Sequence, residues 1–274
     1  MIYDISGSPL TDEATGFEKL INIRYKRDDT TGAFYTILNI PQTNNKGEKQ
    51  YPFVYWPNYP NGGIESTLTM NKRKGFLVAI NGGRASSPWG PGTVVTGLPK
   101  GTVIQNSVLL QQGTDNNSSE TMDRVLTINN AGELGYAGRT DSGATMIENG
   151  IVSAVTGFVP IMSNYLKIQD VDQTIPYIDT DVDSQRQVLG QYGNGDYVIL
   201  STEGRGNQGS GYFSVRQLQD LCISHGIKHA FLLDGGGSME TVVGKKQLNP
   251  IYEETYGRLV ATYIVWNGTT EFQA

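Results

Sequence analysis

The sequence predicts an α+β fold, in which a single domain holds a mixed, strand-rich sheet core and a few helices. Short apolar runs that end at Gly, Asn, Asp or Ser recur along the chain, which is typical of strands joined by turns. Only three stretches have both the start and the stop signals of a helix. A chain of 274 residues can bury a sizeable core, and its single cysteine, Cys222, permits no intramolecular disulfide.

Residues 1–30 are expected to form an N-terminal arm or docking segment, separate from the domain of residues 31–274. Gly, Ser, Thr and acidic residues are mixed in this segment with few apolar pairs. The pattern then changes, and residues 33–40 predict the first strand of the domain. The polar loop 42–49 and the aromatic run 51–56 continue the packed part of the chain.

The middle of the chain alternates between strands and short helices. Residues 66–74 predict a helix, and the apolar strand 76–80 that follows ends in Asn81-Gly82-Gly83. The later signals predict, in chain order, a hairpin over 126–136, a short helix capped by Asp141 or Ser142, a strand over 152–159, and a hairpin over 186–202 with its turn at Asn194-Gly195.

The clearest helix covers residues 215–225. Ser214 and Gln217 form a capping box at its start, and Gly226 supplies a left-handed stop at its end. One apolar stripe is expected to face the core, and it comprises Val215, Leu218, Leu221 and Cys222. Cys222 is therefore expected to be a small core residue and not a nucleophile, because reactive thiols need an electropositive, partly exposed setting.

The stretch that organises the chain is Phe231 to Glu240. An apolar run ends there in Asp234, three glycines and Ser238, which predicts a strand that stops at a turn without bulky side chains. Glycines let main-chain N–H groups converge on an anion or a polar substrate. The alternative is a tight turn that needs positive φ, in which Asp234 accepts hydrogen bonds from nearby amides.

Charge and hydropathy exclude several classes of partner. The net charge of −6 argues against a nucleic-acid face, and the one basic cluster, Lys72-Arg73-Lys74, is expected to be a solvated helix end. The first residues lack the pattern of a secretory leader, and no stretch approaches the length of a membrane span. We expect neither nucleic acid nor membrane as a partner. The compartment stays open, with assembly into a particle released by lysis as one route out of a cell.

Seven short motifs follow one another between residues 35 and 267. They are, in chain order, Asn81-Gly82-Gly83, Gly157-Phe158-Val159-Pro160-Ile161, Arg186-Gln187-Val188-Leu189-Gly190, Glu203-Gly204-Arg205, the helix capped by Ser214, the run from Leu233 to Ser238, and Arg258-Leu259-Val260-Ala261 before Ile264-Val265-Trp266. This order resembles the phosphodiester glycosidase family, which includes an enzyme that removes N-acetylglucosamine from a sugar phosphodiester. The ordered set is far more specific than the glycines alone.

The resemblance implies hydrolysis of a glycosyl phosphodiester in a glycan or cell-surface polymer, such as a teichoic acid or a phosphorylated capsule. Cleavage between C1 and a phosphate oxygen develops positive charge at the anomeric carbon, so the site needs carboxylates near the sugar and donors around the phosphate. The expected catalytic residues are Asp234 and, as second choice, Glu203. The expected substrate-binding residues are Asn81, Gly82, Arg186, Arg205, Gly235, Gly236, Ser238 and Arg258.

Two alternatives stay open. The arginines could form buried ion pairs with Asp234, Glu203 or Glu240 instead of phosphate forks. The chain also departs from the family pattern, because Arg84-Ala85 stands where an aromatic pair is usual and Gly257 where a Glu is usual. A binding-only domain, as a carbohydrate-binding or structural virion protein, is therefore the second functional hypothesis. A P-loop enzyme is disfavoured, since no Lys-Ser or Lys-Thr follows the glycines.

No metal ligands or cofactor are assigned, because His225 and His229 have no metal-binding partner at the usual spacing. A structural or substrate-linked divalent cation remains compatible with the sequence. The start of the chain, with Tyr3, Asp4, Gly7 and Pro9, resembles the opening of phage tail-associated proteins. That resemblance implies docking of the N-terminal arm onto other virion proteins.

Overall fold

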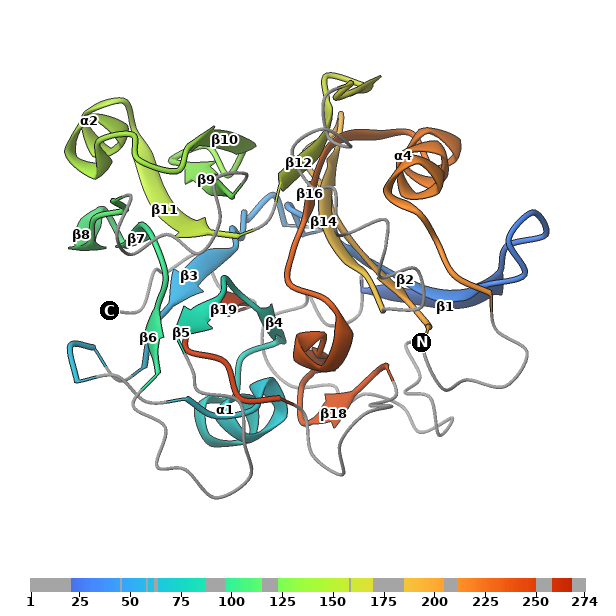
Figure 1. Ribbon diagram of the computed structural model, residues 1–274, viewed down its shortest axis with the longest axis horizontal. Helices are drawn as coiled ribbons and strands as arrows, with labels where there is room; N and C mark the ends of the chain where they lie inside the picture. Colours follow the sequence, from blue (N-terminus) through green and yellow to red (C-terminus); the bar gives the residue numbers. More distant parts are fainter. Residues whose placement is uncertain are drawn as a thin grey trace.

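The computed structural model describes most of the chain, and the structural statements below refer to those residues. The described ranges are 21–44, 46–57, 59–61, 64–86, 97–114, 123–157, 159–169, 185–204, 211–249 and 258–267. Three β-sheets and a small two-stranded ribbon form the body of the protein, with the helices at its periphery (Figure 1). Within these ranges no helix is both long enough and apolar enough to span a bilayer.

The largest sheet has seven strands and one face covered by the helix α4 (Val215–Ser224). Every strand pair in it is antiparallel. The strands are, in spatial order, β1 (Asn22–Arg27), β2 (Phe34–Ile40), β15 (Tyr197–Thr202), β14 (Gln187–Tyr192), β16 (Ile227–Leu232), β12 (Val159–Ser163) and β13 (Leu166–Lys167).

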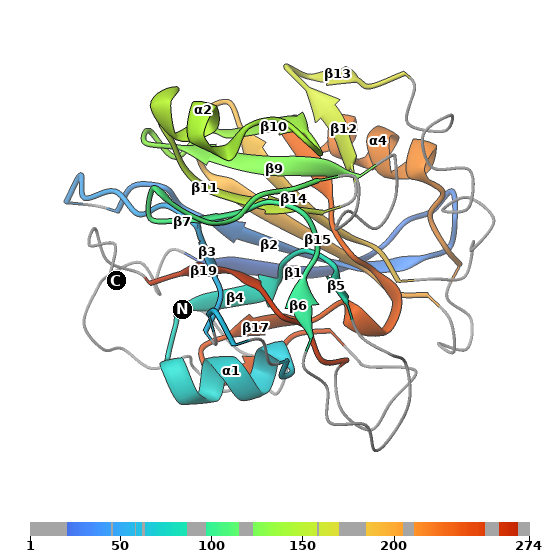
Figure 2. The same ribbon diagram turned by 60° about the vertical axis from the view of Figure 1, so that its left-hand side comes forward.

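Two five-stranded antiparallel sheets complete the core. The second sheet has the order β10 (Leu134–Gly138), β9 (Arg124–Asn129), β11 (Ile151–Thr156), β7 (Val103–Gln105) and β8 (Val108–Gln111). The third has the order β18 (Lys246–Gln247), β17 (Thr241–Val243), β4 (Val78–Asn81), β19 (Tyr263–Trp266) and β3 (Phe53–Tyr55). β5 (Ala85–Ser86) and β6 (Leu98–Pro99) form the ribbon. Figure 2 shows α1 (Thr67–Lys74) on the outer side of the third sheet, and α2 (Gly143–Glu148) beside the second.

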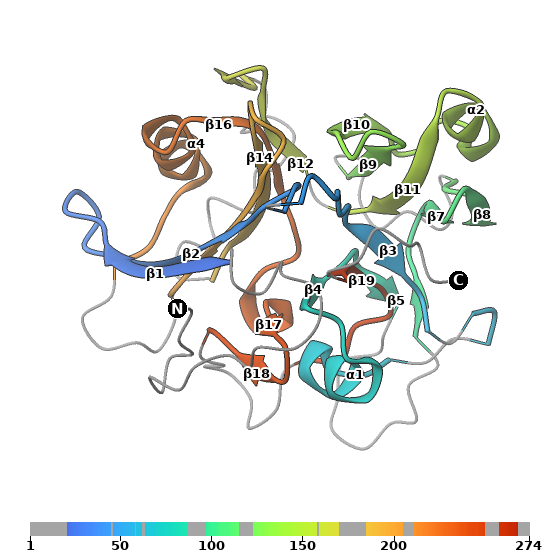
Figure 3. The ribbon, with the colours of Figure 1, turned by 180° about the vertical axis from the view of Figure 1, so that it is seen from behind.

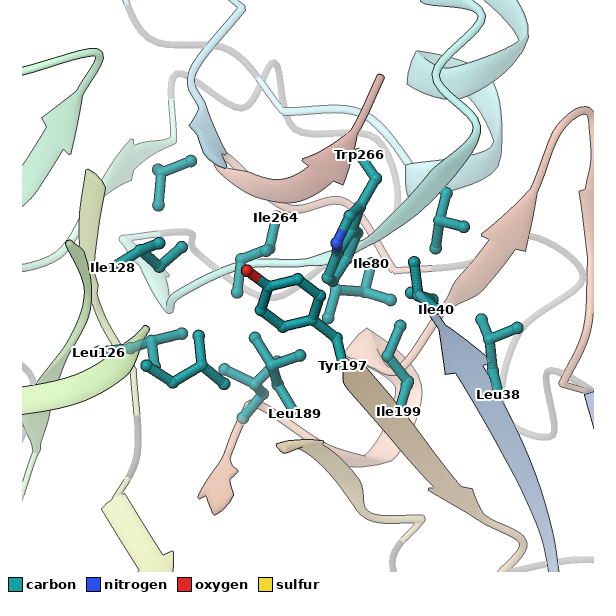
Figure 4. Packing of buried hydrophobic residues seen from close by; sticks show 14 of the residues in the cluster. Leu38, Ile40, Ile80, Leu126, Ile128, Leu189, Tyr197, Ile199, Ile264 and Trp266 are labelled. Carbon is teal, nitrogen blue, oxygen red and sulfur yellow. The ribbon is translucent and has the colours of Figure 1, made fainter. Parts of the chain in front are cut away.

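The central core lies where the three sheets face one another. Tyr197 from the first sheet packs against Trp266 from the third, with ring centroids 5.8 Å apart and an interplanar angle of 64°. Figure 4 shows the two rings surrounded by aliphatic side chains, among them Leu126 from the second sheet. A separate cluster fills the space between the seven-stranded sheet and α4. Successive residues of a strand therefore pack into different clusters: Leu189 packs into the central core, and Val188 packs into the cluster below α4.

The structure confirms the predicted helices and their caps. Ser66, Ser142 and Ser214 each accept a hydrogen bond from the first helical turn, and the capping box of α4 is complete. Gly226 ends α4 at φ +68°. The predicted stripe of α4 is buried, and burial raises the pKa of the Cys222 thiol to about 12, which agrees with a core role.

Three predictions about the strands are corrected. The sheets are antiparallel within the described residues, not mixed. Residues 152–159 form parts of two strands in different sheets, β11 and β12, with a break at Gly157. The predicted arm, residues 1–30, includes β1, which pairs along its full length with β2. Its C-terminal part is thus an edge strand of the sheet, and residues 1–20 lie outside the described part.

Candidate functional site

The candidate site lies where the seven-stranded sheet meets the third sheet. β16 ends at Leu232 and β17 begins at Thr241, so residues 233–240 lead the chain from one sheet to the other. Figure 3 shows this crossing above β18 and beside β17. The crossing contains Asp234, the three glycines and Ser238, which the sequence places at the centre of the expected site.

The glycines of the crossing are needed for its close packing. Gly236 has φ +55° and begins a short 3-10 turn, Gly236–Ser238. Its N–H donates to the carbonyl oxygen of Gln185 at 2.9 Å. A Cβ at Gly235 would lie 2.4 Å from that same oxygen, so no side chain fits there. The turn is thereby fixed against the start of β14.

Asn81 supports the turn from behind. Its side chain is fully buried, and its Nδ2 donates to the carbonyl oxygen of Asp234 at 2.9 Å. Its Oδ1 accepts from the N–H of Glu240 at 3.2 Å, so one amide spans both ends of the crossing. Gly82 is also part of this support, because a Cβ there would lie 2.7 Å from the carbonyl oxygen of Thr262. The structure thus places both residues at the site, in contact with backbone.

Asp234 is the partly exposed carboxylate of the crossing. Burial raises the pKa of Asp234 above its ordinary value, although the nearby charges of Arg84 and Arg258 and hydrogen bonds from Ser238 and the Gly235 N–H all lower it. The net direction is upward, so this carboxyl holds its proton to a higher pH than an exposed aspartate. Such a shift in a group beside cations is typical of functional sites.

Arg258 is held against the glycine turn. Its backbone N–H donates to the carbonyl oxygen of Gly237 at 3.1 Å. The guanidinium group lies over Gly237 so closely that a Cβ on that glycine would be 3.1 Å from Nη2. Gly237 therefore makes room for the arginine, and the cation is brought near Asp234. The role of Arg258 in substrate binding stays a prediction.

Arg84 is a site residue that the sequence analysis did not select. It directly follows Asn81-Gly82-Gly83, and among the charged groups it lowers the pKa of Asp234 the most. Its Nε lies 3.8 Å from Oδ1 of Asp123, a carboxylate that is completely buried. Arg84 thus lies near both a buried acid and the candidate catalytic acid. The sequence feature that could have identified Arg84 is its position directly after Asn81-Gly82-Gly83, where the family usually has an aromatic residue.

Arg186 directly precedes β14 and Glu203 directly follows β15, at the same end of the large sheet. Arg186 is buried, and the main chains of Arg186 and Thr202 are paired by an N–H···O=C bond of 2.8 Å. The pairing of β14 with β16 extends past the ends of both strands, and this register places the backbone of Arg186 beside that of Asp234. Glu203 is buried too, and its Oε1 accepts from the Tyr25 hydroxyl at 2.6 Å. The backbone of Glu203 is two strand spacings from Gly235, roughly 10 Å.

A second layer of buried polar groups fixes the C-terminal half of the crossing. Asn249 donates from Nδ2 to the carbonyl oxygen of Met239 at 3.0 Å and accepts from the N–H of Thr241 at 2.7 Å. The Thr241 hydroxyl lies within hydrogen-bond distance of Gln187 and Ser201 on the large sheet. These groups join the two sheets directly behind the turn. The sequence analysis did not identify them.

Glu240 is buried next to the N-terminus of α1. Burial raises its pKa, and the amides of Leu68 and Thr67 at the start of the helix offset this only in part. Of the remaining expected residues, Ser238 bonds to Asp234, whereas Arg205 lies outside the described residues. The described ranges contain no cluster of three or more His, Cys, Asp or Glu that could hold a metal ion.

Comparison with solved structures shows which proteins share the fold. The catalytic domain of zebrafish N-acetylglucosamine-1-phosphodiester alpha-N-acetylglucosaminidase, auto-inhibited by its pro-peptide, superposes with a TM-score of 0.64 at 19% identity, covering 89% of this chain and 81% of that one. A hypothetical protein from Synechocystis gives 0.61 at 10% identity, covering 90% and 61%. An exported protein from Burkholderia pseudomallei gives 0.57 at 11% identity, covering 85% and 74%.

Two comparisons rest on the sequence. An uncharacterised protein from the SPbeta prophage of Bacillus subtilis is 26% identical over 253 residues, which cover 88% of this chain. The match spans only 37% of the length of that relative. The family model for phosphodiester glycosidases matches residues 74–266, well over half of the chain and all of the described site residues except Tyr25. The chain therefore belongs to the phosphodiester glycosidase family.

Proposed function

We propose that the protein hydrolyses a glycosyl phosphodiester, releasing a sugar from a glycan or cell-surface polymer. The observation that supports this most is the placement of the Asp234 carboxyl on a glycine turn, under the influence of both Arg84 and Arg258. Two guanidinium groups can hold the phosphate, and their forked donors suit its oxygens. The acid beside them is then next to the bond that breaks.

The raised pKa of Asp234 suits a proton donor. In the proposed reaction Asp234 gives its proton to the oxygen that bridges C1 and phosphorus, and the C1–O bond breaks as positive charge develops at C1. Glu203 accepts a proton from a water molecule, whose oxygen bonds to C1. The Tyr25 hydroxyl donates to Oε1 of Glu203 at 2.6 Å, which fixes the orientation of this carboxyl group. The products are a free sugar and a phosphomonoester.

The test is release of reducing sugar from a panel of glycosyl phosphodiesters by the wild-type protein and by Asp234→Asn. Asp220→Asn is the matched control, because Asp220 is an exposed acid on α4, where it pairs with Lys167. Turnover by wild type and the control, with loss in Asp234→Asn, supports the proposal. Hydrolysis at the wild-type rate by Asp234→Asn would remove Asp234 from the mechanism.

A second candidate is a non-catalytic carbohydrate-binding protein of a phage particle. It is favoured by the prophage origin of the Bacillus relative and by the departure from the family pattern at Arg84. Under this hypothesis the N-terminal residues would dock onto other virion proteins. Calorimetric binding of the same phosphodiesters without release of sugar from any of them would favour this candidate over the enzyme.

A further inference from the structure

A stacked aromatic pair, of which Tyr25 is exposed and Phe34 half-buried, lies beside Glu203 on the first two strands of the large sheet. Tyr25 on β1 and Phe34 on β2 have ring centroids 5.4 Å apart and ring planes only 5° from parallel. The Tyr25 side chain is nevertheless 55% exposed. A large aromatic surface is thus held rigidly at the surface of the protein, although burial would stabilise it more.

Three contacts fix the orientation of this pair. The Tyr25 hydroxyl donates to Oε1 of Glu203 at 2.6 Å, and the N–H of Glu203 donates to the carbonyl oxygen of Phe34 at 2.8 Å. The guanidinium of Arg27 lies 5.7 Å from the centre of the Phe34 ring, and its Nε donates to the carbonyl oxygen of Gly32. The Tyr25 ring is therefore ordered before any ligand arrives, which lowers the entropic cost of binding.

The position of the pair relative to Asp234 follows from the strand register. Gly235, Gln185 and Glu203 are aligned just beyond the ends of β16, β14 and β15, and Tyr25 reaches Glu203 from β1, beyond β2. The order of the backbones along the sheet end is thus Gly235, Gln185, Glu203 and Phe34, with Asp234 directly before Gly235. A sugar attached to a phosphate at Asp234 would occupy the space up to Glu203, and the aromatic pair is the next surface that an extended glycan meets.

We infer that Tyr25, backed by Phe34, forms a stacking subsite for a second sugar ring, joined to the sugar that the proposed reaction releases. This inference rests on the proposed function. The face of an aromatic ring is electron-rich, and the C–H groups on one side of a pyranose ring carry the complementary partial charge. The protein would then act on oligosaccharide phosphodiesters and select them over monosaccharide ones.

The test compares the methyl phosphodiester of a monosaccharide with that of the disaccharide that extends it. We expect wild type to favour the disaccharide compound in kcat/KM by about tenfold, and Tyr25→Ala to lose this preference. Tyr25→Phe keeps the ring but loses the hydroxyl bond to Glu203, so it should lower both rates equally and retain the ratio. Tyr136→Ala is the control, because Tyr136 is similarly exposed but lies on β10 of the second sheet.

A binding measurement separates this inference from the proposed function. Saturation-transfer NMR with the free disaccharide needs no turnover, and we expect transfer to the distal ring with wild type and Tyr25→Phe but not with Tyr25→Ala. If no compound is hydrolysed while this difference appears, the subsite stands and the proposed reaction fails. Equal transfer with wild type and Tyr25→Ala, or an unchanged disaccharide preference in Tyr25→Ala, overturns the subsite.

Discussion

Nδ2 of Asn81 donates a 2.9 Å hydrogen bond to the carbonyl oxygen of Asp234, so the residue that ends β4 in the third sheet holds the backbone of the candidate acid at the end of the first. The same side chain accepts from the N–H of Glu240. Because both partners are backbone groups, the contact fixes where the Asp234 carboxyl can lie. Asn81 therefore acts as a positioning residue.

The first prediction concerns this bond. Asn81→Ala leaves a buried carbonyl and a buried N–H without their partner, and we expect a loss of about 1 to 3 kcal/mol in the free energy of unfolding. Turnover should fall as well, since the acid is less well placed. Urea melts and initial rates measure the two effects. The exposed Asn130→Ala is the control, and equal behaviour of the two variants would contradict the role of Asn81.

The parts of the fold that the sequence predicts are those set by local chemistry. Ser214 caps α4 and Gly226 ends it because a hydroxyl acceptor and a left-handed residue act within one helical turn. The antiparallel arrangement could not be predicted in the same way. It depends on which distant strands pair, as when β2 joins β15 and β4 joins β17, and no local signal specifies that choice.

The residues of the candidate site divide in the same way, into those marked by local sequence and those brought together only by folding. Asp234 and Ser238 could be predicted because the glycines around them mark a backbone turn that excludes side chains. The Arg84–Asp123 pair could not, since its members lie far apart along the chain and the interaction is formed only on folding. Tyr25 falls in a segment whose composition predicts an arm, although alternate residues of that segment contribute to one face of a strand.

The second prediction tests the packing of α4. Leu218 is fully buried and Leu221 nearly so, whereas Ile223 on the same helix is 48% exposed. Leu218→Ala or Leu221→Ala should lower the free energy of unfolding by about 2 to 5 kcal/mol, because each opens a cavity in the core below the helix. Ile223→Ala should change it far less. A denaturant midpoint that stays unchanged in either leucine variant would mean that the apolar stripe does not stabilise the fold.

The third prediction concerns Arg84 and the pH dependence of turnover. Its positive charge lowers the pKa of Asp234, so Arg84→Ala should raise that pKa further. A proton donor loses activity as pH rises through its pKa, and the alkaline limb of kcat should therefore move to higher pH in the variant. KM for the phosphodiester should rise as well, by about tenfold or more, since one phosphate donor is lost. Lys228→Ala, a half-buried cation on β16, is the control. An alkaline limb that does not move, or moves to lower pH, would contradict the role of Arg84.

The last prediction separates stability from catalysis at Asp234. Its pKa in the folded protein lies above the ordinary value, so the folded state binds the proton more tightly than the unfolded state does. The stability that this difference contributes is fully present below the unfolded pKa of about 4, and it is lost as pH rises through the folded pKa. Above the unfolded pKa the unfolded chain releases this proton more readily than the folded protein does, which favours unfolding, whereas Asn has no proton to release and has nearly the same shape.

We therefore expect Asp234→Asn to unfold at a higher urea concentration than wild type at pH 7, with a smaller difference at pH 4. Turnover should nevertheless fall by about two to four orders of magnitude, because the amide cannot donate the proton. The two measurements together are diagnostic, since a residue with only a structural role would lose stability and activity in parallel. Asp220→Asn, on the exposed face of α4, should change neither quantity. An Asp234→Asn variant that is less stable than wild type at pH 7 would show that the carboxylate is retained for its structural contacts with Ser238 and the arginines.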